Sequence, residues 1–297
     1  MKFIILRGVP GSGKSTHAMA LQAEGYTRVN RDDIRFALYS AYWGKGVDEE
    51  VVTRVENAAI EGALARGADV VLDATNLRAK NLNAKLSIAN LYDAEVEFRD
   101  FPISLAEAVA RDAARDRTVG EAVIARMFKN YRINTVTGIL PKAPYILPTF
   151  EPYARDTSKV KAFIVDTDGT MANGEGLRGW FDTHLYHVDV VHEHVQTVVR
   201  AAQKQGFEIV ALSGRDDEFR DVSLTWWKDV AGINPDLFLM RPKGDKRMDA
   251  IVKYELFKAH VEPNYNVLGA FDDRPQVLRM WRKLGIPTFT IGTGEEF

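Results

Sequence analysis

The sequence contains no cysteine and no long hydrophobic run. The absence of cysteine excludes disulfide bridges, thiolate zinc sites and cysteine nucleophiles, and it is compatible with a reducing cytosol. The apolar run near the start, from Phe3 to Leu6, is too short for a signal peptide or a membrane span. We therefore expect a cytoplasmic protein with no membrane partner, which binds metal ions through oxygen ligands and has no transition-metal site.

The composition is that of a folded globular protein, with 46% hydrophobic and 27% charged residues. A chain of 297 residues is longer than one typical core, which predicts two domains. The net charge is -2, with 20 basic against 18 acidic residues in 1–150 and 19 against 23 in the remainder. Six basic residues lie close together in the first half: Arg111, Arg115, Arg117, Arg126, Lys129 and Arg132. Such a stretch either faces phosphates or is a solvated helix face.

Both halves alternate between strand and helix patterns, which predicts an α/β fold with a parallel sheet in each domain. The expected strands cover residues 2–6, 27–30, 68–72, 95–101, 162–165, 207–212 and 267–271, and the clearest expected helices cover 14–23, 188–205 and 246–260. Prolines between 140 and 152 interrupt any helix, so the boundary is expected near residue 155. We predict domains at 1–150 and 151–297, with a linker over about 141–159.

A glycine-rich motif follows the first expected strand and precedes the first expected helix. Its pattern, Gly-x-x-x-x-Gly-Lys-Ser, lets backbone N–H groups wrap phosphate oxygens at a helix N-terminus. Lys14 is expected to reach the β and γ phosphates of ATP, and the Ser15 hydroxyl to bind Mg²⁺. The candidate ATP-binding residues of this motif are Gly8, Gly11, Ser12, Gly13, Lys14, Ser15 and Thr16. The alternative is a glycine-rich turn.

Two later strand ends offer candidates for the acceptor side of this site. Asp32 can accept the proton of an acceptor hydroxyl. The alternative is that Asp32 or Asp33 caps a helix beginning at Ile34 and that Arg35 pairs with it. Asp73 ends the strand over 70–72, where it can orient Mg²⁺ and its water or start a helix as a polar cap. The neighbouring candidates are Thr75 and Asn76.

Arg111 and Arg115 are four residues apart on an expected helix, so both project from one face. There they can close over the γ-phosphate of ATP as a lid. The alternative is that Asp112 and Asp116 hold them in surface ion pairs.

A pair of carboxylates, Asp166 and Asp168, follows a buried strand of the second half. Asp166 can attack phosphorus to form an aspartyl phosphate, while Asp168 protonates the leaving oxygen and later activates water. Mg²⁺ offsets the charge of phosphate and carboxylates; its expected ligands are Asp166, Asp168, Asp272 and Asp273. Ser213 can donate a hydrogen bond to the phosphate, and a lysine after Gly244 can neutralise it.

Together these blocks resemble two superfamilies, the P-loop kinases in the first half and the haloacid dehalogenase (HAD) phosphatases in the second. Kinase first and phosphatase second, at this length, is similar to the phage-type bifunctional polynucleotide kinase/phosphatases, which heal RNA and DNA ends before ligation. The resemblance extends to Asn-Arg-Asp-Asp-Ile-Arg, Arg-x-x-x-Arg before Met-Phe-Lys, Ser-Gly-Arg, and Asp-Asp-Arg followed by Met-Trp-Arg. It implies a Rossmann-like phosphatase domain with a small cap.

Carried over by residue, the resemblance makes Asp32 the general base for a 5′-hydroxyl, Arg35 a contact to the acceptor's 3′-phosphate, and Arg115 a lid residue supported by Arg111. In the second half it makes Asp166 the nucleophile and Asp168 the acid and base. The remaining roles are phosphate contacts at Ser213, Gly214 and Arg215, a neutralising lysine at Lys253, in competition with Lys246, and a Mg²⁺ ligand at Asp272.

Two places depart from the phage pattern. One extra residue separates Asp73 from Asn76. The cap segment over 172–187, with Trp180, Phe181, His184 and His187, has no clear match, and substrate preference is expected there. The resemblance implies ATP and Mg²⁺ as cofactors, RNA or DNA termini as partners, a ligase acting downstream, homo-oligomers, and the host cytoplasm if the protein is phage-encoded.

The leading hypothesis is a bifunctional enzyme that phosphorylates 5′-hydroxyl ends and removes 3′-phosphate or 2′,3′-cyclic phosphate ends. One alternative is a kinase and a phosphatase that act oppositely on a small metabolite such as a nucleoside or a sugar. The basic stretch and Arg35 favour a polyanionic acceptor. A second alternative, a nucleotide-switched scaffold that has lost catalysis, is disfavoured by the intact Lys14, Ser15, Asp166 and Asp168.

Overall fold

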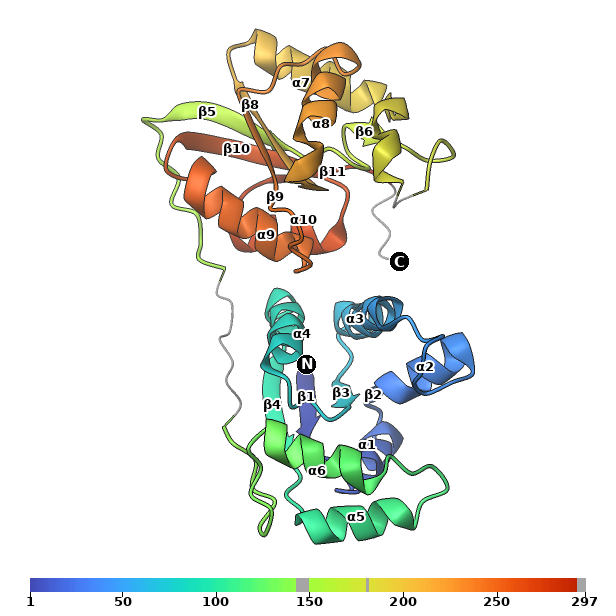
Figure 1. The fold of residues 1–297 in the computed structure, drawn as a ribbon. Coiled ribbons are helices and arrows are strands. Elements are labelled where there is room, and N and C mark those ends of the chain that lie inside the picture. Colours follow the sequence, from blue (N-terminus) through green and yellow to red (C-terminus); the bar gives the residue numbers. More distant parts are fainter. Residues whose placement is uncertain (143–149, 180–181, 293–297) are drawn as a thin grey trace. The chain divides into compact units, whose positions relative to one another are not determined.

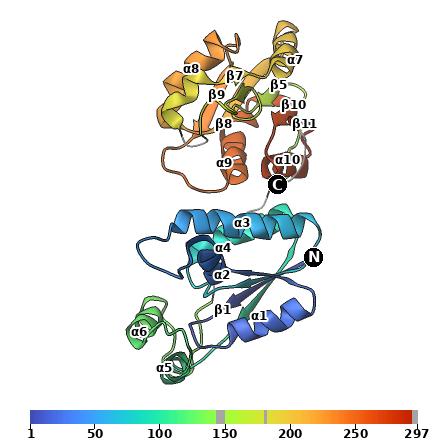
Figure 2. The same ribbon diagram turned by 90° about the vertical axis from the view of Figure 1, so that its right-hand side faces the viewer.

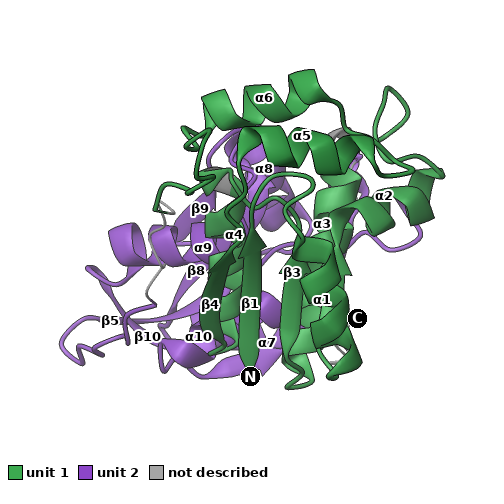
Figure 3. Ribbon diagram, turned by 90° about the horizontal axis from the view of Figure 1, so that it is seen from below, with its two compact units in different colours: residues 1–149 green, residues 150–297 purple. Residues whose placement is uncertain are grey.

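The computed structural model describes residues 1–142, 150–179 and 182–292 (Figure 1). The chain divides into two compact units, Met1–Thr149 and Phe150–Phe297, coloured separately in Figure 3. Residues 143–149 of the expected linker lie outside the described residues, as do Trp180 and Phe181 of the expected cap and the side chain of His184. Each unit is an α/β layer structure around a parallel sheet, which confirms the expected fold class.

The sheet of unit 1 has four parallel strands in the order β2-β3-β1-β4. Their bounds are β1 (Lys2–Arg7), β2 (Thr27–Asn30), β3 (Val70–Asp73) and β4 (Glu95–Asp100). The apolar residues of β1 and β3 are fully buried, because helices cover both faces of the sheet. Figure 2 shows α1 on one face, and α3 and α4 on the other. The bounds of these helices are α1 (Lys14–Ala23), α3 (Glu49–Ala65) and α4 (Ala79–Leu91).

Three further helices of unit 1 are α2 (Arg31–Tyr39), α5 (Leu105–Ala113) and α6 (Glu121–Asn130). In Figures 1 and 3, α5 and α6 lie beyond the end of the sheet at which β1 finishes. They pack together through a small apolar cluster that includes Ala108, Ile124 and Phe128. The P-loop begins at the same end of the sheet, so α5 and the residues after it stand over the phosphate site.

Unit 2 has a five-stranded parallel sheet in the order β11-β10-β5-β8-β9. Its strands are β5 (Val160–Val165), β8 (Glu208–Asp216), β9 (Leu237–Arg241), β10 (Tyr265–Asp272) and β11 (Thr288–Thr290). Helices α7 and α8 lie on one face, and α9 and α10 on the other (Figure 1). These helices span α7 (Glu193–Lys204), α8 (Arg220–Asp229), α9 (Asp249–Leu256) and α10 (Pro275–Lys283), and the π-turn η3 (Phe257–Val261) continues α9. A core around Trp226 and Trp227 fills the α7–α8 side.

A small ribbon stands at the carboxyl edge of this sheet. Strands β6 (Ala172–Asn173) and β7 (Val190–Val191) pair antiparallel. Between them lies the 3₁₀ turn η1 (Thr183–Val188), and a second 3₁₀ turn, η2 (Asp217–Phe219), follows β8. The expected helix over 188–205 is therefore wrong at its start: α7 begins at Glu193, because Val190 and Val191 are held in the ribbon.

Three other element ends differ from the sequence expectation. Helix α5 ends at Ala113, so Arg115 is not on the same helix as Arg111. Helix α9 begins at Asp249, so Lys246 precedes it. Strand β8 continues to Asp216, with an irregular register between Ser213 and Asp216. None of the helices in the described part of the chain combines the length and apolar character that crossing a bilayer requires.

Candidate active sites

The phosphate loop of unit 1 joins β1 to α1. Gly13 has φ 94°, a left-handed conformation that glycine adopts without strain, and it turns the chain into the helix. No side chain caps the first turn of α1, and no acidic residue lies in it. The free N–H groups and the positive end of the helix are thus left for an anion.

Lys14 is buried inside this loop. Its Nζ donates to the Val9 carbonyl at 2.8 Å and to Ser12 Oγ at 3.2 Å. Burial lowers the pKa of Lys14 to about 8; Asp73 opposes the shift, Arg115 adds to it and Asp32 opposes it. The charges of these three predicted residues therefore all act on Lys14, which places them around one site.

Asp73, the last residue of β3, connects the loop to β2. Its Oδ1 accepts a hydrogen bond from Ser15 Oγ at 3.1 Å. Its Oδ2 accepts from Arg28 Nη2 at 2.7 Å and from Asn30 Nδ2 at 2.8 Å. A hydroxyl and a carboxylate side by side beneath a phosphate loop are suitable oxygen ligands for a divalent cation. Sequence reasoning missed Arg28, whose partner is 45 residues away in the chain.

Asp32 lies in the first turn of α2, but it does not cap this helix. Asn30 is the N-cap, and its Oδ1 accepts from the backbone N–H of Asp33 at 2.9 Å. The Asp32 carboxylate pairs instead with two arginines, Arg35 at 2.6 Å and Arg117 at 3.0 Å. The capping alternative is therefore wrong for both Asp32 and Asp33, while the pairing of Asp32 with Arg35 is observed. Arg35 also forms a two-pronged pair with Glu49.

Thr75 and Asn76 hold the loop through hydrogen bonds that involve the backbone. The Thr75 carbonyl accepts from the N–H of Gly8 at 3.1 Å. The Asn76 amide donates to the carbonyl of Leu6 at 2.8 Å, and Asn76 itself has a positive φ of 48°. Through these hydrogen bonds, Thr75 and Asn76 support the phosphate loop.

The two predicted lid arginines have different surroundings. Arg111 pairs with Glu107 one turn back along α5, in an exposed position. Arg115 follows the helix, 3.6 Å from Asp112, and donates to the Arg117 carbonyl at 3.2 Å. Asp112 is buried and accepts two backbone N–H groups of the loop before α6. That loop is thus fixed at its base, with Arg115 and Arg117 on it.

In unit 2 the buried ammonium of Lys253 lies among three carboxylates. Its Nζ is 2.9 Å from Asp166, 2.8 Å from Asp272 and 3.6 Å from Asp249. These groups come from the ends of β5 and β10 and from α9, which meet at the carboxyl edge of the sheet. The structure therefore places Lys253 at this site, whereas Lys246 is exposed and lies before α9.

The electrostatics of this cluster show a surplus of negative charge. Burial raises the pKa of Asp166 to about 7, with Lys253 opposing the shift. Burial and the charge of Asp166 raise the pKa of Asp273 to about 6. Burial by itself lowers the pKa of Lys253, but the surrounding carboxylates raise it well above its usual range, so the ammonium stays protonated. One ammonium does not neutralise all of these carboxylates.

Asp166, Asp272 and Asp273 each bring one carboxylate oxygen within 4.8 Å of the others. Such a set fits a divalent cation, which needs oxygen ligands and balances the surplus charge. Gly169, with φ 77°, allows the close approach of Asp273, since a β-carbon there would overlap the carboxylate. The Asp168 carboxylate lies outside this group, because two arginines hold it elsewhere; the role of Asp168 as a metal ligand stays a prediction.

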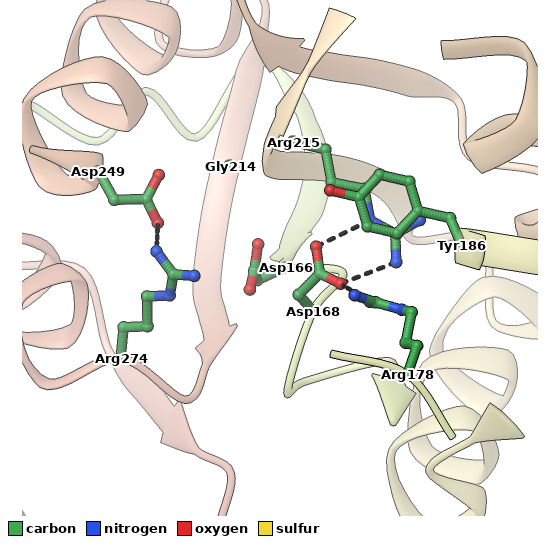
Figure 4. Close-up of a pocket in the computed structure, with 8 residues that line it drawn as sticks. All are labelled: Asp166, Asp168, Arg178, Tyr186, Gly214, Arg215, Asp249 and Arg274. Atoms are coloured by element: carbon green, nitrogen blue, oxygen red, sulfur yellow. Dashed lines mark hydrogen bonds and ion pairs between the residues drawn. The ribbon is translucent and has the colours of Figure 1, made fainter. Parts of the chain in front are cut away.

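Those two arginines are Arg178 and Arg215. Arg215 forms a two-pronged pair with Asp168 at 2.8 Å, and Arg178 reaches it at 2.9 Å (Figure 4). Burial raises the pKa of Asp168, but the hydrogen bonds and charges of the two guanidinium groups outweigh it and hold the pKa below its usual range. Buried Asp189 pairs with both arginines, and the ring of Tyr186 lies over both.

A small cavity of about 80 Å³ opens between these groups. Figure 4 shows the Asp168 arginine cluster on one side, the Asp249–Arg274 pair on the other, and Asp166 between them. Its lining residues are Asp166, Asp168, Arg178, Tyr186, Gly214, Arg215, Asp249 and Arg274. Ser213 lies fully buried behind the lining, where its Oγ accepts from the N–H of Arg215 at 3.2 Å.

Sequence reasoning singled out four of these lining residues and missed Arg178, Tyr186, Asp249 and Arg274. A signal existed for Arg178, because it is the one lysine or arginine in the segment over 172–187. A signal for Arg274 existed in the Asp-Asp-Arg block, where it directly follows two predicted metal ligands. Tyr186 and Asp249 carry no comparable signal.

In the comparisons with known proteins, each unit matches a family model. Residues 160–296 match the model of the phosphatase domain of polynucleotide kinase PNKP, and residues 3–133 match the model of an AAA domain. The chain is also 28% identical over 304 residues to a "Putative bifunctional polynucleotide kinase/RNA ligase" of Autographa californica nuclear polyhedrosis virus. That alignment covers 97% of this chain and 42% of the viral relative, so the chain spans less than half of the relative's length.

Two solved chains are similar over nearly the full length. They come from structures described as the Pnkp1/Rnl/Hen1 RNA repair complex and the Pnkp1/Rnl/Hen1 complex, with 29% and 30% sequence identity. Each alignment covers 99% of this chain and 96% or 97% of the other, with a TM-score of 0.46.

Proposed function

We propose that the chain is a bifunctional polynucleotide kinase/phosphatase that heals the ends of broken nucleic acids, on the premise of the two family models that it matches. Unit 1 transfers the γ-phosphate of ATP to a 5′-hydroxyl end, and unit 2 removes a 3′-phosphate or 2′,3′-cyclic phosphate. The observation that carries the proposal is that each unit holds its own set of phosphate-handling side chains at the carboxyl edge of its sheet.

The kinase step is assigned to groups around the phosphate loop. Lys14 and the N–H groups at the start of α1 bind the β and γ phosphates of ATP, and Arg115, on the loop after α5, covers them. Asp32 accepts the proton of the 5′-hydroxyl as its oxygen attacks the γ-phosphorus. The pairs with Arg35 and Arg117 hold the Asp32 carboxylate in one orientation.

The phosphatase step uses the two carboxylates at the end of β5. Asp166 attacks the phosphorus of the 3′-phosphate, the bond from phosphorus to the 3′-oxygen breaks, and Asp168 gives the leaving oxygen its proton. Asp168 then takes a proton from the water that hydrolyses the aspartyl phosphate. A bound phosphate competes with Asp168 for Arg178 and Arg215; once these pairs are broken, Asp168 takes up a proton from solvent, and this is the proton that it gives to the leaving oxygen.

Both active sites have suitable ligands for a divalent cation, which we propose is Mg²⁺. Ser15 and Asp73 would hold it in unit 1, and Asp166, Asp272 and Asp273 in unit 2. A bound Mg²⁺ neutralises phosphate oxygens and lowers the barrier to nucleophilic attack. Lys253 contributes a fixed positive charge beside Asp166 that keeps the nucleophile oriented.

The products of the two reactions are a 5′-phosphate and a 3′-hydroxyl, which are the two ends that a nucleic-acid ligase joins. We therefore propose that a ligase consumes the product. The viral relative, whose printed name includes an RNA ligase, supports this proposal.

The test uses one oligonucleotide with a 5′-hydroxyl and a 3′-phosphate, incubated with Mg²⁺ and γ-labelled ATP, after which both ends are resolved. We expect Asp32→Asn to lose 5′ labelling and keep 3′-phosphate removal, and Asp166→Asn to show the reverse. Asp93→Asn and Asp229→Asn are matched controls, because both residues are exposed and lie outside the two active sites.

The proposal fails if the wild-type protein changes neither end of the oligonucleotide while it still hydrolyses a simple phosphate ester and phosphorylates a nucleoside or a sugar. That outcome would assign the two sites to a small metabolite. Loss of both activities in either variant would contradict the assignment of separate sites.

A further inference from the structure

An exposed group of aromatic rings stands beside the kinase site of unit 1. It consists of Phe36 on α2 and Tyr42 and Trp43 in the loop that follows. Phe36 and Tyr42 stack with their centroids 5.0 Å apart and an interplanar angle of 18°, and Trp43 leans against Tyr42 at 6.2 Å. Trp43 is 58% exposed and Phe36 49% exposed. Large rings at such exposure leave apolar area in water, which is a feature of binding surfaces.

Arg117 joins this group to the proposed general base. Its guanidinium carbon lies 3.8 Å from the centroid of the Tyr42 ring, and its Nη2 donates to Asp32 Oδ2 at 3.0 Å. Phe36 already stacks on Tyr42, and two flat groups do not share one face of a ring. Phe36, Tyr42 and Arg117 therefore form a layered stack that ends next to Asp32.

Arg117 is partly open to solvent. Its side chain is 36% exposed, and the one carboxylate that pairs with its guanidinium in the described structure, that of Asp32, lies at its edge. A guanidinium held flat by an aromatic ring is itself a surface on which a nucleobase stacks. The position beyond Arg117 is thus shaped for one further planar ring.

We infer that the stack of Phe36, Tyr42 and Arg117, widened by Trp43, is a platform for the nucleobase at the 5′ end of the acceptor strand. This inference rests on the proposed kinase function. The 5′-hydroxyl that loses its proton to Asp32 belongs to the same nucleotide as that base. A hydroxyl bound at Asp32 therefore brings its own base to the neighbourhood of Arg117.

The chemistry of the platform fits a single strand of any sequence. Stacking uses the flat face that every nucleobase has, whereas sequence is recognised through the polar edges of the bases. The platform is also on the acceptor side of the site, because Arg117 donates its hydrogen bond to Asp32, the proposed general base, and not to the phosphate loop. We therefore expect little preference for the identity of the 5′ base, and a clear loss when the base is absent.

The test compares two 5′-hydroxyl oligonucleotides that differ at the terminal nucleotide, one with a base and one abasic. For Tyr42→Ala and for Trp43→Ala we expect kcat/KM on the base-bearing strand to fall about tenfold. On the abasic strand the same variants should match the wild type, because the lost contact is already missing. Tyr42→Phe and Trp43→Phe keep an aromatic ring and should stay near the wild-type value.

Arg117→Lys is a second test of the platform, because it keeps the positive charge but removes the planar guanidinium group. It should lose the discrimination between base-bearing and abasic strands while it still phosphorylates both. Two measurements on the same preparations report folding: the KM for ATP and the removal of 3′-phosphate by unit 2 should be unchanged in the Tyr42 and Trp43 variants.

The inference is overturned if the alanine variants lose the same factor on both strands, or lose nothing. A raised KM for ATP in the Trp43 or Tyr42 variants, with the oligonucleotide unaffected, would assign the platform to the adenine of the donor and also overturn it. These outcomes are distinct from failure of the proposed function, in which the wild type phosphorylates neither oligonucleotide.

Discussion

Replacement of Lys253 by methionine tests whether the Lys253 ammonium stabilises the buried carboxylates of the phosphatase site. The side chain is 1% exposed, and it is the ammonium that lies among Asp166, Asp272 and Asp249. Methionine fills a similar volume, so the change removes charge and leaves packing largely intact. Asp166 and Asp272 are then buried without the ammonium that pairs with them, whereas Asp249 keeps its pairs with Arg241 and Arg274. Removal of one partner of a buried ion pair costs about 3 to 5 kcal/mol of unfolding free energy.

For a unit of about 150 residues, a loss of that size lowers the melting temperature by roughly 6 to 20 °C. The assay is thermal unfolding in the presence of a metal chelator, followed by tryptophan fluorescence. Four of the five tryptophans lie after residue 150, so the signal reports mainly unit 2. Lys246→Met is the matched control, and we expect it to leave the transition unchanged because Lys246 is exposed.

Millimolar Mg²⁺ should restore part of the stability lost in Lys253→Met, since a divalent cation among the carboxylates replaces the missing positive charge. The double variant Lys253→Met, Asp272→Asn should be more stable than Lys253→Met in the chelator, because one of the unpaired charges is gone. Equal melting temperatures for Lys253→Met and Lys246→Met would refute the reasoning, as would a further loss in the double variant.

Three further changes have defined expected outcomes. Gly169→Ala places a β-carbon against the Asp273 carboxylate and strains a left-handed backbone, so phosphatase activity should fall at least tenfold with kinase activity retained in the same assay. Asn30→Ala removes the cap of α2 and should lower the unfolding free energy of unit 1 by about 1 kcal/mol in denaturant melts; no change would show that the cap is not needed. Arg178→Ala removes one of the guanidinium groups on Asp168, and its phosphatase KM should rise while the fold of unit 2, measured by circular dichroism, is retained.

The sequence allowed prediction of those parts of the sites that are local in the chain. The P-loop is set by a run of eight residues whose glycines and lysine have fixed roles, so α1 was predicted with its observed bounds over Lys14–Ala23. Asp166 follows directly from a buried strand, and parallel strands end at one edge of a sheet, so its approach to Asp272 was foreseeable.

The parts that could not be predicted depend on tertiary contacts. Arg178 reaches Asp168 only because the β6–β7 ribbon folds its segment back over the end of β5, and no periodicity in the sequence encodes that return. The choice between Lys246 and Lys253 depended on where α9 begins, and helix starts are set by capping and packing. The stack of Arg117 on Tyr42 joins loops 75 residues apart, which are brought together by separate anchors.

The two sites should differ in when they bind metal. In unit 1, Arg28 and Asn30 already occupy one oxygen of Asp73, so a single carboxylate oxygen and the Ser15 hydroxyl are left for a cation. In unit 2, three carboxylates carry surplus negative charge before any substrate arrives. Cation affinity grows with the number of charged oxygen ligands, so unit 2 should bind one ion in the free protein, and unit 1 should bind its ion together with ATP.

Titration with Mn²⁺ as a paramagnetic substitute for Mg²⁺ measures this difference. We expect one tight site per chain without nucleotide, and two in the presence of a non-hydrolysable ATP analogue. Asp272→Asn should remove the first site and leave the nucleotide-dependent one, because the two sites share no ligand. Two sites of equal affinity in the nucleotide-free protein would show that the Arg28 pair does not restrain Asp73, and that metal binding in unit 1 does not depend on the phosphates of ATP.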